Sequence, residues 1–512
     1  MKIHVGIIGR QTGWQNLLQQ EGVPFSFASG DVAPDDYSVL VVGDDANERE
    51  SEKVRLYLQA GGAVLCSASV DSRLRHTTDQ RIYLEYVKTG NRSHFSAVGL
   101  LDIDSPCHLA WKANDLESRR GLFSAYVGPV GQGHVIALPF DPSVLVLDER
   151  SAVRSFYSPE KRLPFETVSL VSKGTLRLLT AECLEILHHR RGLPYIHLWY
   201  YPRGAHSIFC FRIDTDYGSK EQIGALRQLA QMNRIPMTWF LDVKSHESYL
   251  QIFAEMKDQE IGIHCYNHVF FPDIQSNIAN IQKAADVLKR TGIAFKAYAA
   301  PYGKWNAEFG KALASFGFEY SSEFSYDYDN LPGDPGNGML QVPVHPICIG
   351  SLKRHSYTDE MMIRYFDFVI RRKLAVREPM FFYHHPRDGH EPVLEWIFEA
   401  MRRERIASKT MGEFSAWWLR RMKTSLKCES SGNNIRLNLP EDGPDDVYVR
   451  ITKSDGTEAI IPRAAQIAME TVRWEAKPAA FLYPDDFLRQ RSFNYRIPLT
   501  KTADALHRFF SP

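Results

Sequence analysis

Short apolar runs alternate along most of the chain with stretches whose apolar residues recur at helical spacing. In residues 1–150 this alternation predicts an open α/β domain with a parallel sheet, because a helix between two strands brings the chain back in the same direction. The second helix should end at Gly61-Gly62, since glycine commonly follows the last helical turn. The predicted strands are residues 3–8, 39–42 and 63–67, and the predicted helices are residues 14–21 and 50–60.

Residues 205–425 repeat the strand-then-helix pattern several times, which predicts a (β/α) barrel. One helix is marked by an apolar stripe over residues 274–288 that ends before Gly292. In such a barrel the chemistry lies at the C-terminal ends of the strands. The predicted strands include residues 208–213, 237–243, 295–300 and 379–385.

The segments on either side of the barrel have different patterns. Residues 151–204 predict a helical linker, with a helical pattern over 165–188 followed by an aromatic stretch rich in Pro and Gly. After Cys428 apolar and polar residues alternate, which is typical of half-exposed strands. Residues 430–512 are therefore expected to form a small β-sandwich. The strands predicted there are residues 435–439, 447–451 and 456–462.

Charge and cysteine content narrow the choice of partners and compartment. The 512-residue chain has 61 basic and 61 acidic residues, so no overall field attracts nucleic acid or an anionic membrane. No apolar run reaches the length of a membrane span, and the N-terminus lacks the features of a signal peptide. The seven cysteines are scattered without Cys-x-x-Cys spacing, which favours free thiols and a cytoplasmic protein. Oligomerisation is left open.

The most informative residues follow two of the predicted strands. Asp214 and Asp216 end the first barrel strand, and alternate residues of an extended chain point to the same side. His264 and His268 follow a later strand at a spacing that lets two imidazoles share a cation. We expect one of the two aspartates and both histidines to bind one divalent metal ion, zinc by default, and the other aspartate to remain as a base. No other cofactor is expected.

Each of these motifs also has a purely structural interpretation. An Asp-x-Asp after a strand is often only a turn, and a single His-x-x-x-His is more often a surface pair than a metal site. A further strand ends in His384-His385-Pro386, which could be the edge of a packed core. Their joint occurrence at strand ends favours a genuine site.

At these residues the chain resembles the polysaccharide deacetylase (NodB-homology) family of carbohydrate esterases, whose domain is a distorted (β/α) barrel. The resemblance covers residues 205–425 and implies that Asp214 is the catalytic base and that Asp216, His264 and His268 bind the metal. It also implies that the backbone N–H of Tyr302 stabilises the oxyanion and that His385 is the general acid. The family's Arg-x-Pro-Tyr-Gly motif appears as Ala299-Ala-Pro-Tyr-Gly303 without its arginine, which normally pairs with the base. Arg212 and Lys304 are the candidate replacements.

The N-terminal domain resembles the class I glutamine amidotransferase-like fold. Members of that fold carry a nucleophilic cysteine between glycines, whereas Cys66 lies in Leu-Cys-Ser-Ala-Ser. We interpret Cys66 as a small buried residue and the domain as non-catalytic.

Three functions remain open from the sequence. The first is metal-dependent N-deacetylation of an N-acetylated sugar or glycan, such as a precursor of a surface polysaccharide. The second is hydrolysis of a small cyclic amide, as in allantoinase-like relatives, and the third is a carbohydrate-binding or scaffold role with a lapsed site. An aromatic rim is expected to contact the sugar rings. Its predicted members are Tyr217, Tyr266, Phe270, Tyr302, Trp305, Tyr326 and Tyr328.

Overall fold

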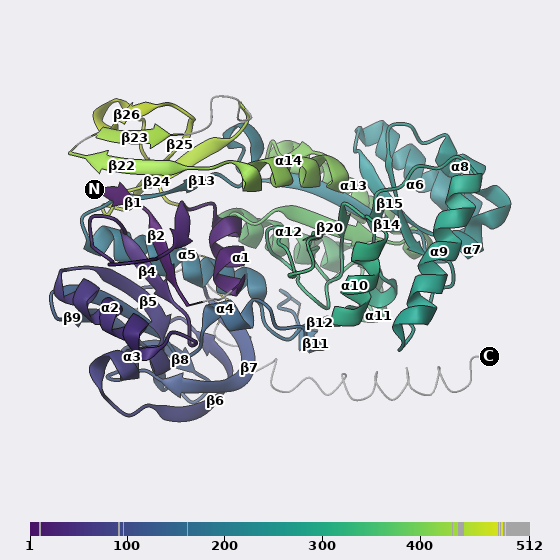
Figure 1. Cartoon of the computed structure of the whole chain (residues 1–512). Helices are drawn as coiled ribbons and strands as arrows, with labels where there is room; N and C mark the ends of the chain where they lie inside the picture. Colours follow the sequence, from purple (N-terminus) through teal and green to yellow (C-terminus); the bar gives the residue numbers. More distant parts are fainter. Residues whose placement is uncertain are drawn as a thin grey trace.

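The computed structural model describes residues 1–9, 12–90, 93–95, 97–160, 162–432, 434–438 and 445–479, together with residues 481, 483, 484 and 487. The N-terminal domain and the barrel lie side by side, and the strands β22–β26, near the C-terminus, lie above the N-terminal domain in the view of Figure 1. Among the described residues, none of the helices combines the length and hydropathy needed to cross a bilayer.

A nine-stranded sheet forms the N-terminal domain, in the order β3-β2-β4-β5-β10-β9-β8-β6-β7. The pairs from β3 to β10 are parallel, as expected, and those from β10 to β7 are antiparallel. The antiparallel half was not evident from the sequence pattern. The strands are β2 (Val5–Ile8), β3 (Phe25–Phe27), β4 (Val39–Val42), β5 (Ala63–Ser67), β6 (Gln80–Lys88), β7 (Leu100–Leu109), β8 (Asp115–Ser118), β9 (Phe123–Val130) and β10 (Gly133–Leu138).

Helices cover both faces of this sheet, giving two separate apolar clusters. The start of α2 is fixed by a capping box, in which Asn47 and Glu50 satisfy each other's backbone N–H groups. Cys66 lies at the end of β5 and is fully buried, and burial raises the pKa of its thiol well above the ordinary value. An inert thiol fits the expectation of a packing residue. The helices are α1 (Thr12–Glu21), α2 (Glu48–Gln59), α3 (Ala68–Arg75) and α4 (Pro142–Leu145).

The connection between the two domains differs from the expected helical linker. Residues Phe165–Ser169 form β12, which pairs with β11 (Ser151–Ser155), and the helix α5 begins only at Lys173 and ends at Arg190. The short stretch of residues 165–169 is compatible with either a strand or a helix, because it has no clear apolar periodicity. Its pairing with β11 selects the strand. The strand β13 (Tyr195–Leu198) follows α5.

The strands near the C-terminus pair with segments from elsewhere in the chain. One four-stranded sheet has the order β1-β22-β23-β26 and another the order β13-β24-β25-β27. Inward-facing residues of both sheets belong to one apolar cluster. Residues 433, 439–444, 480, 482, 485, 486 and 488–512 of the expected β-sandwich lie outside the described residues, and the sandwich stays a prediction. The strands are β1 (Lys2–Ile3), β22 (Lys427–Ser431), β23 (Asn434–Asn438), β24 (Tyr448–Thr452), β25 (Thr457–Pro462), β26 (Gln466–Ala468) and β27 (Glu475–Ala476).

The barrel is a curled parallel sheet in the order β19-β18-β17-β16-β15-β14-β20, with β21 also paired to β14. Its two edges approach each other beyond β19, where His345 N–H donates a 2.8 Å hydrogen bond to the Phe381 carbonyl of β20. The expected distorted (β/α) barrel is thus confirmed. The strands are β14 (Ile208–Asp214), β15 (Met237–Asp242), β16 (Glu260–Cys265), β17 (Ala297–Tyr298), β18 (Tyr320–Ser321), β19 (Leu340–Gln341), β20 (Met380–His384) and β21 (Ala407–Ser408).

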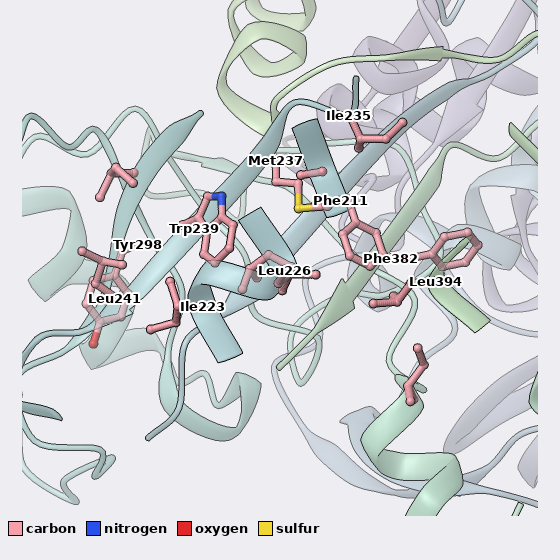
Figure 2. Close-up of a cluster of buried hydrophobic side chains, with 14 of the residues drawn as sticks. Phe211, Ile223, Leu226, Ile235, Met237, Trp239, Leu241, Tyr298, Phe382 and Leu394 are labelled. Carbon is pink, nitrogen blue, oxygen red and sulfur yellow. The ribbon is translucent and has the colours of Figure 1, made fainter. Parts of the chain in front are cut away.

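Alternation along the barrel strands separates structural from chemical residues. Phe211 of β14, Trp239 of β15 and Phe382 of β20 point outward and pack against α6 and α13 (Figure 2). Residues one position away, such as Arg212 and Asp214, therefore face the barrel interior. The helices are α6 (Lys220–Asn233), α7 (Val243–His246), α8 (Gln251–Ala254), α9 (Ile274–Arg290), α10 (Ala307–Ser315), α11 (Ile349–Arg354), α12 (Asp359–Ala375), α13 (Glu391–Arg403) and α14 (Met411–Lys423).

A buried polar network joins the N-terminal domain to the barrel. Glu21 at the end of α1 accepts hydrogen bonds from the hydroxyls of Tyr195 and Tyr200, at 2.9 and 2.6 Å. Arg177 of α5 lies 3.1 Å from the same carboxylate. Arg421 of α14 donates to the backbone carbonyls of Glu21 and Leu198. Charged and hydroxyl groups therefore join α1 and α5 to α14 and to the segment that contains Tyr195 and Tyr200.

Candidate active site

The parallel strands of the barrel bring the predicted site residues to one edge. Asp214 ends β14, and Asp216 follows it by two residues. His264 lies within β16, the second neighbour of β14, and His385 directly follows β20, its neighbour on the other side. Because the C-terminal ends of parallel strands lie at the same side of the sheet, these residues converge despite separations of up to 171 positions in the sequence.

Three ligand atoms of the expected metal group lie close together. Asp216 Oδ1 is 3.1 Å from His264 Nε2 and 3.2 Å from His268 Nε2, and the two Nε2 atoms are 3.1 Å apart. Tetrahedral ligands at zinc, with bonds of about 2.0–2.1 Å, lie about 3.3 Å from one another. The three residues are the ones predicted as ligands, and together they form a possible metal-ligand group.

The surroundings of this group fit a cation. Asp216 Oδ1 is buried and receives no hydrogen bond of acceptable geometry from the described residues. His264 Nδ1 lies 2.6 Å from the Ala299 carbonyl, so Nδ1 donates and the lone pair of Nε2 is directed at the group. Burial alone would raise the pKa of Asp216, but the imidazoles of His264 and His268 hold it well below the ordinary value. The three residues therefore present a carboxylate and two imidazole nitrogens to one point.

The fourth predicted residue, Asp214, has a buried arginine partner. Arg212 Nε and Nη2 each donate a 2.6 Å hydrogen bond, one to each Asp214 oxygen. The Arg212 guanidinium also donates to the Ser322 carbonyl at 2.5 Å and is fully buried. Lys304, the other candidate partner, has its ammonium 5.8 Å from the Tyr302 ring centre and 5.9 Å from that of Phe270. Of the two candidate partners, Arg212 is thus the one that pairs with Asp214.

A second buried carboxylate holds the loop in which that arginine is missing. Glu323 accepts a 3.0 Å hydrogen bond from the backbone N–H of Ala300. The side chain is completely buried, and burial raises the pKa of Glu323 to about 7. Sequence reasoning missed Glu323, because its role depends on where the loop returns in space.

Two tyrosines in the left-handed conformation flank the metal-ligand group. Tyr217 has φ 52° and Tyr302 has φ 60°, and their rings are 5.5 and 4.9 Å from the His268 ring. A non-glycine residue in this conformation costs roughly 1–2 kcal/mol, and such strain concentrates at functional sites. Both side chains are more than half exposed, at 58% and 56%.

The rest of the expected aromatic rim does not form. Four of its members are nearly buried and belong to the packed core, and the fifth, Phe270, packs against that core while partly exposed. The prediction was wrong because tyrosine and tryptophan rings bury large apolar areas wherever a loop folds back onto the barrel. The four buried members are Tyr266, Trp305, Tyr326 and Tyr328.

His385 lies on the other side of the group and has its own carboxylate. Its Nε2 is 3.6 Å from Asp216 Oδ2, and its Nδ1 is 3.0 Å from Asp388 Oδ2. Burial alone would lower the pKa of His385, but Asp388 and Cys348 raise it well above the ordinary value. Asp388 and Cys348 therefore favour the protonated imidazole, which is the form that can donate a proton.

Asp388 was also missed, although the spacing His385-Pro-Arg-Asp388 contains it. The short helix η4 (Pro386–Asp388) turns the chain so that residues three apart meet, and a proline after the histidine is the available sign of that turn.

Comparison with known proteins bears on this geometry. Residues 212–321 match the model of the polysaccharide deacetylase family. The chain carries a polysaccharide deacetylase domain. The match includes Arg212, both aspartates, His264, His268 and Tyr302, whereas His385 lies beyond it. This deacetylase domain supports a hydrolase that acts on carbon–nitrogen bonds.

Solved structures similar to the chain include three of comparable score. A Mycobacterium smegmatis protein described as a polysaccharide deacetylase has 17% identity, with 43% of this chain and 93% of that one covered and a TM-score of 0.38. The allantoinase Puue has 15% identity, with 43% and 92% covered and a TM-score of 0.37. A Pseudomonas aeruginosa PAO1 protein described as a polysaccharide deacetylase has 15% identity, with 42% and 92% covered and a TM-score of 0.37. No curated protein matches the chain, so the assignment of the deacetylase domain depends on the family match.

Proposed function

We propose that the protein is a metal-dependent N-deacetylase that hydrolyses the acetamido group of an N-acetylated sugar or glycan. The observation that carries the proposal is that possible metal ligands, a carboxylate and a proton donor all lie at the C-terminal ends of the barrel strands. Ligand atoms of three side chains lie 3.1–3.2 Å from one another, as the ligands of one cation would, and a fourth side chain, Asp214, ends β14 with Arg212 as its hydrogen-bond partner. A proton donor, His385, completes the group from the neighbouring strand.

Asp216, His264 and His268 would hold the cation, and zinc is the default for one carboxylate and two imidazoles. When bound, such a cation supplies Lewis acidity, which lowers the pKa of water and polarises a carbonyl group. The same ligands accept cobalt, nickel or iron.

The protein's own residues would manage the protons. Asp214 takes a proton from the attacking water, whose oxygen bonds to the amide carbon. The Tyr302 N–H donates to the oxygen on which negative charge develops. As the carbon–nitrogen bond breaks, His385 gives its proton to the leaving nitrogen, so that the products are acetate and a free amine.

The accessible surroundings favour a sugar over a small enclosed amide. Tyr217 and Tyr302 stand exposed on either side of the site and offer ring faces for the apolar sides of a sugar. All seven cysteines are buried and unpaired, which fits a reducing compartment. In the cytoplasm, a lipid- or nucleotide-linked precursor is a more accessible substrate than a polymer outside the cell.

Acetate release from N-acetylhexosamine-containing glycans and nucleotide sugars tests the proposal. We expect release by the metal-loaded protein and its loss in Asp216→Ala. The matched control is Asp258→Ala, because Asp258 is exposed and precedes β16 at the opposite end of the barrel. A metal-loaded protein that is inert on every N-acetylated sugar would contradict the proposal, and turnover of a cyclic amide instead would favour the allantoinase-like alternative.

A further inference from the structure

A second group of metal-ligand side chains lies behind the proposed general acid. Cys348 Sγ is 3.9 Å from His385 Nδ1, and Asp388 Oδ2 is 3.0 Å from the same nitrogen. These three ligand atoms all lie within 4.8 Å of one another. Cys348 precedes α11, and the other two residues bracket η4, so the group is assembled from two separate segments.

This arrangement is not that of a nucleophilic triad. A cysteine activated by a histidine uses one ring nitrogen, and the orienting carboxylate uses the other. Here the sulfur and the carboxylate both approach Nδ1, while Nε2 faces Asp216. A single Nδ1–H is shared between the two, and Cys348 Sγ also lies 3.5 Å from Ser351 Oγ, whereas a cation placed between the three side chains can bind sulfur, nitrogen and oxygen together.

The separations agree with those at a tetrahedral cation. With bonds of about 2.3 Å to sulfur and 2.0–2.1 Å to nitrogen and oxygen, sulfur and nitrogen would lie about 3.6 Å apart, and nitrogen and oxygen about 3.3 Å apart. The observed values are 3.9 and 3.0 Å. Each observed separation thus lies within about 0.3 Å of the one expected for a shared tetrahedral cation.

The local packing and charge also suit a cation. Asp388 lies against Gly350, where an added Cβ would come 2.1 Å from Oδ2, so the absence of a side chain there gives the carboxylate its position. As thiolate, imidazole and carboxylate, the three ligands carry two negative charges, which balance a divalent ion. Arg354 of α11 lies 3.5 Å from the Glu166 carboxylate, which offsets the positive charge of the guanidinium.

We propose that Cys348, His385 and Asp388 form a second, inhibitory site for a thiophilic divalent cation such as zinc. Binding displaces the thiol proton of Cys348 and the proton on Nδ1 of His385 to solvent. The ring then keeps only the proton on Nε2, and giving it up would leave an imidazolate. His385 can no longer protonate a leaving amine, so occupancy stops turnover. The inhibitory consequence depends on the proposed function of His385, whereas binding of the cation does not.

Cobalt separates the two sites spectroscopically. The group of Asp216, His264 and His268 contains no thiol, so a thiolate-to-Co²⁺ charge-transfer absorption reports only a cysteine site. We expect the metal-free full-length protein to develop this near-ultraviolet band during titration with Co²⁺, saturating at one thiolate site per chain. Acetate release should rise as the first site fills and fall severalfold as the band saturates.

Cysteine variants identify the ligand. Cys348→Ala and Cys348→Ser should each lose the band and resist inhibition, relative to their own maximal rate, at metal concentrations that silence the wild type. Cys428→Ala is the matched control, because Cys428 is equally buried but lies in β22. It should keep both the band and the inhibition.

The outcomes separate this site from the proposed function. No band at saturating Co²⁺, or a band that persists in Cys348→Ala, would overturn the second site. Zinc-edge X-ray absorption of the wild-type protein with two equivalents of zinc decides the point without any variant, since a sulfur ligand lies at about 2.3 Å. A protein that shows the band but releases no acetate under any loading would retain the second site and lose the proposed function.

Discussion

The ion pair between Arg212 and Asp214 gives the sharpest test of how the site is built. Replacing Arg212 by Met keeps most of the side-chain volume but leaves the Asp214 carboxylate buried without its cation. Arg212 is fully buried and Asp214 is 3% exposed, so water cannot take over the lost hydrogen bonds. Two bonds of 2.6 Å are lost, together with those to Ser322.

Two estimates of the cost agree. Removing one partner of a buried ion pair typically costs about 3–5 kcal/mol. Coulomb's law gives about 4 kcal/mol for unit charges about 4 Å apart at an effective dielectric constant of about 20. A loss of about 3 kcal/mol corresponds to an increase of roughly a hundredfold in local opening, since 1.4 kcal/mol is about a factor of ten.

Hydrogen exchange is the appropriate assay, because a chain with several domains does not unfold in one step. In the metal-free protein, amides of β14 and β15 should exchange roughly a hundredfold faster in Arg212→Met than in the wild type. Amides of the N-terminal sheet, remote from the change, provide the internal control and should be unaffected.

A double-mutant cycle isolates the pair. Asp214→Asn removes the charge that needs compensation, so Arg212→Met should cost about 3 kcal/mol less in that background than in the wild type. Arg212→Lys keeps the charge but cannot form both hydrogen bonds, and its effect should be intermediate. Equal costs in the two backgrounds, or unchanged exchange in β14, would refute the reasoning.

Three further predictions follow from the site and the domain junction. Asp388→Asn removes a group that raises the pKa of His385. Because a general acid must be protonated, the alkaline limb of the pH profile of kcat/KM should move to lower pH in this variant. An unmoved limb would count against the role of His385 as the general acid. Dialysis against a chelator should abolish acetate release, and one equivalent of zinc per chain should restore it, whereas full activity without metal would contradict the ligand assignment. Glu21→Ala leaves the buried Arg177 without its carboxylate partner and should destabilise the junction by about 3 kcal/mol. Faster proteolysis between the domains measures this effect, and Glu52→Ala, at an exposed position, is the control.

The residues at strand ends could be predicted because their placement follows from local rules. Asp214, Asp216 and His264 each end or follow a recognisable apolar run, and the edge at which parallel strands end is common to all of them. Strand alternation then decides that the chemical residues face inward. None of this requires knowledge of contacts between distant segments.

The features that could not be predicted depend on long-range pairing. β22 pairs with β1, and β24 with β13, so residues 427–476 complete sheets begun by segments hundreds of positions earlier. Apolar alternation identifies these strands but contains no information about their partners. Likewise, Glu323 became a candidate only once its carboxylate was seen to accept the Ala300 N–H.

The position of Arg212 explains why alanine is compatible with position 299. The Arg212 guanidinium lies 5.3 Å from the Phe240 ring centre and 5.5 Å from that of Tyr383, and Ala299 belongs to the same buried cluster as both rings. A second guanidinium at position 299 would enter this cluster, where like charges repel strongly because little water separates them. Pairing of Asp214 with an arginine from its own strand and pairing with an arginine from the loop are therefore alternative arrangements. When Arg212 pairs with Asp214, the loop that contains Ala299 needs another contact to hold it in place. The hydrogen bond from Ala300 N–H to Glu323 provides that contact.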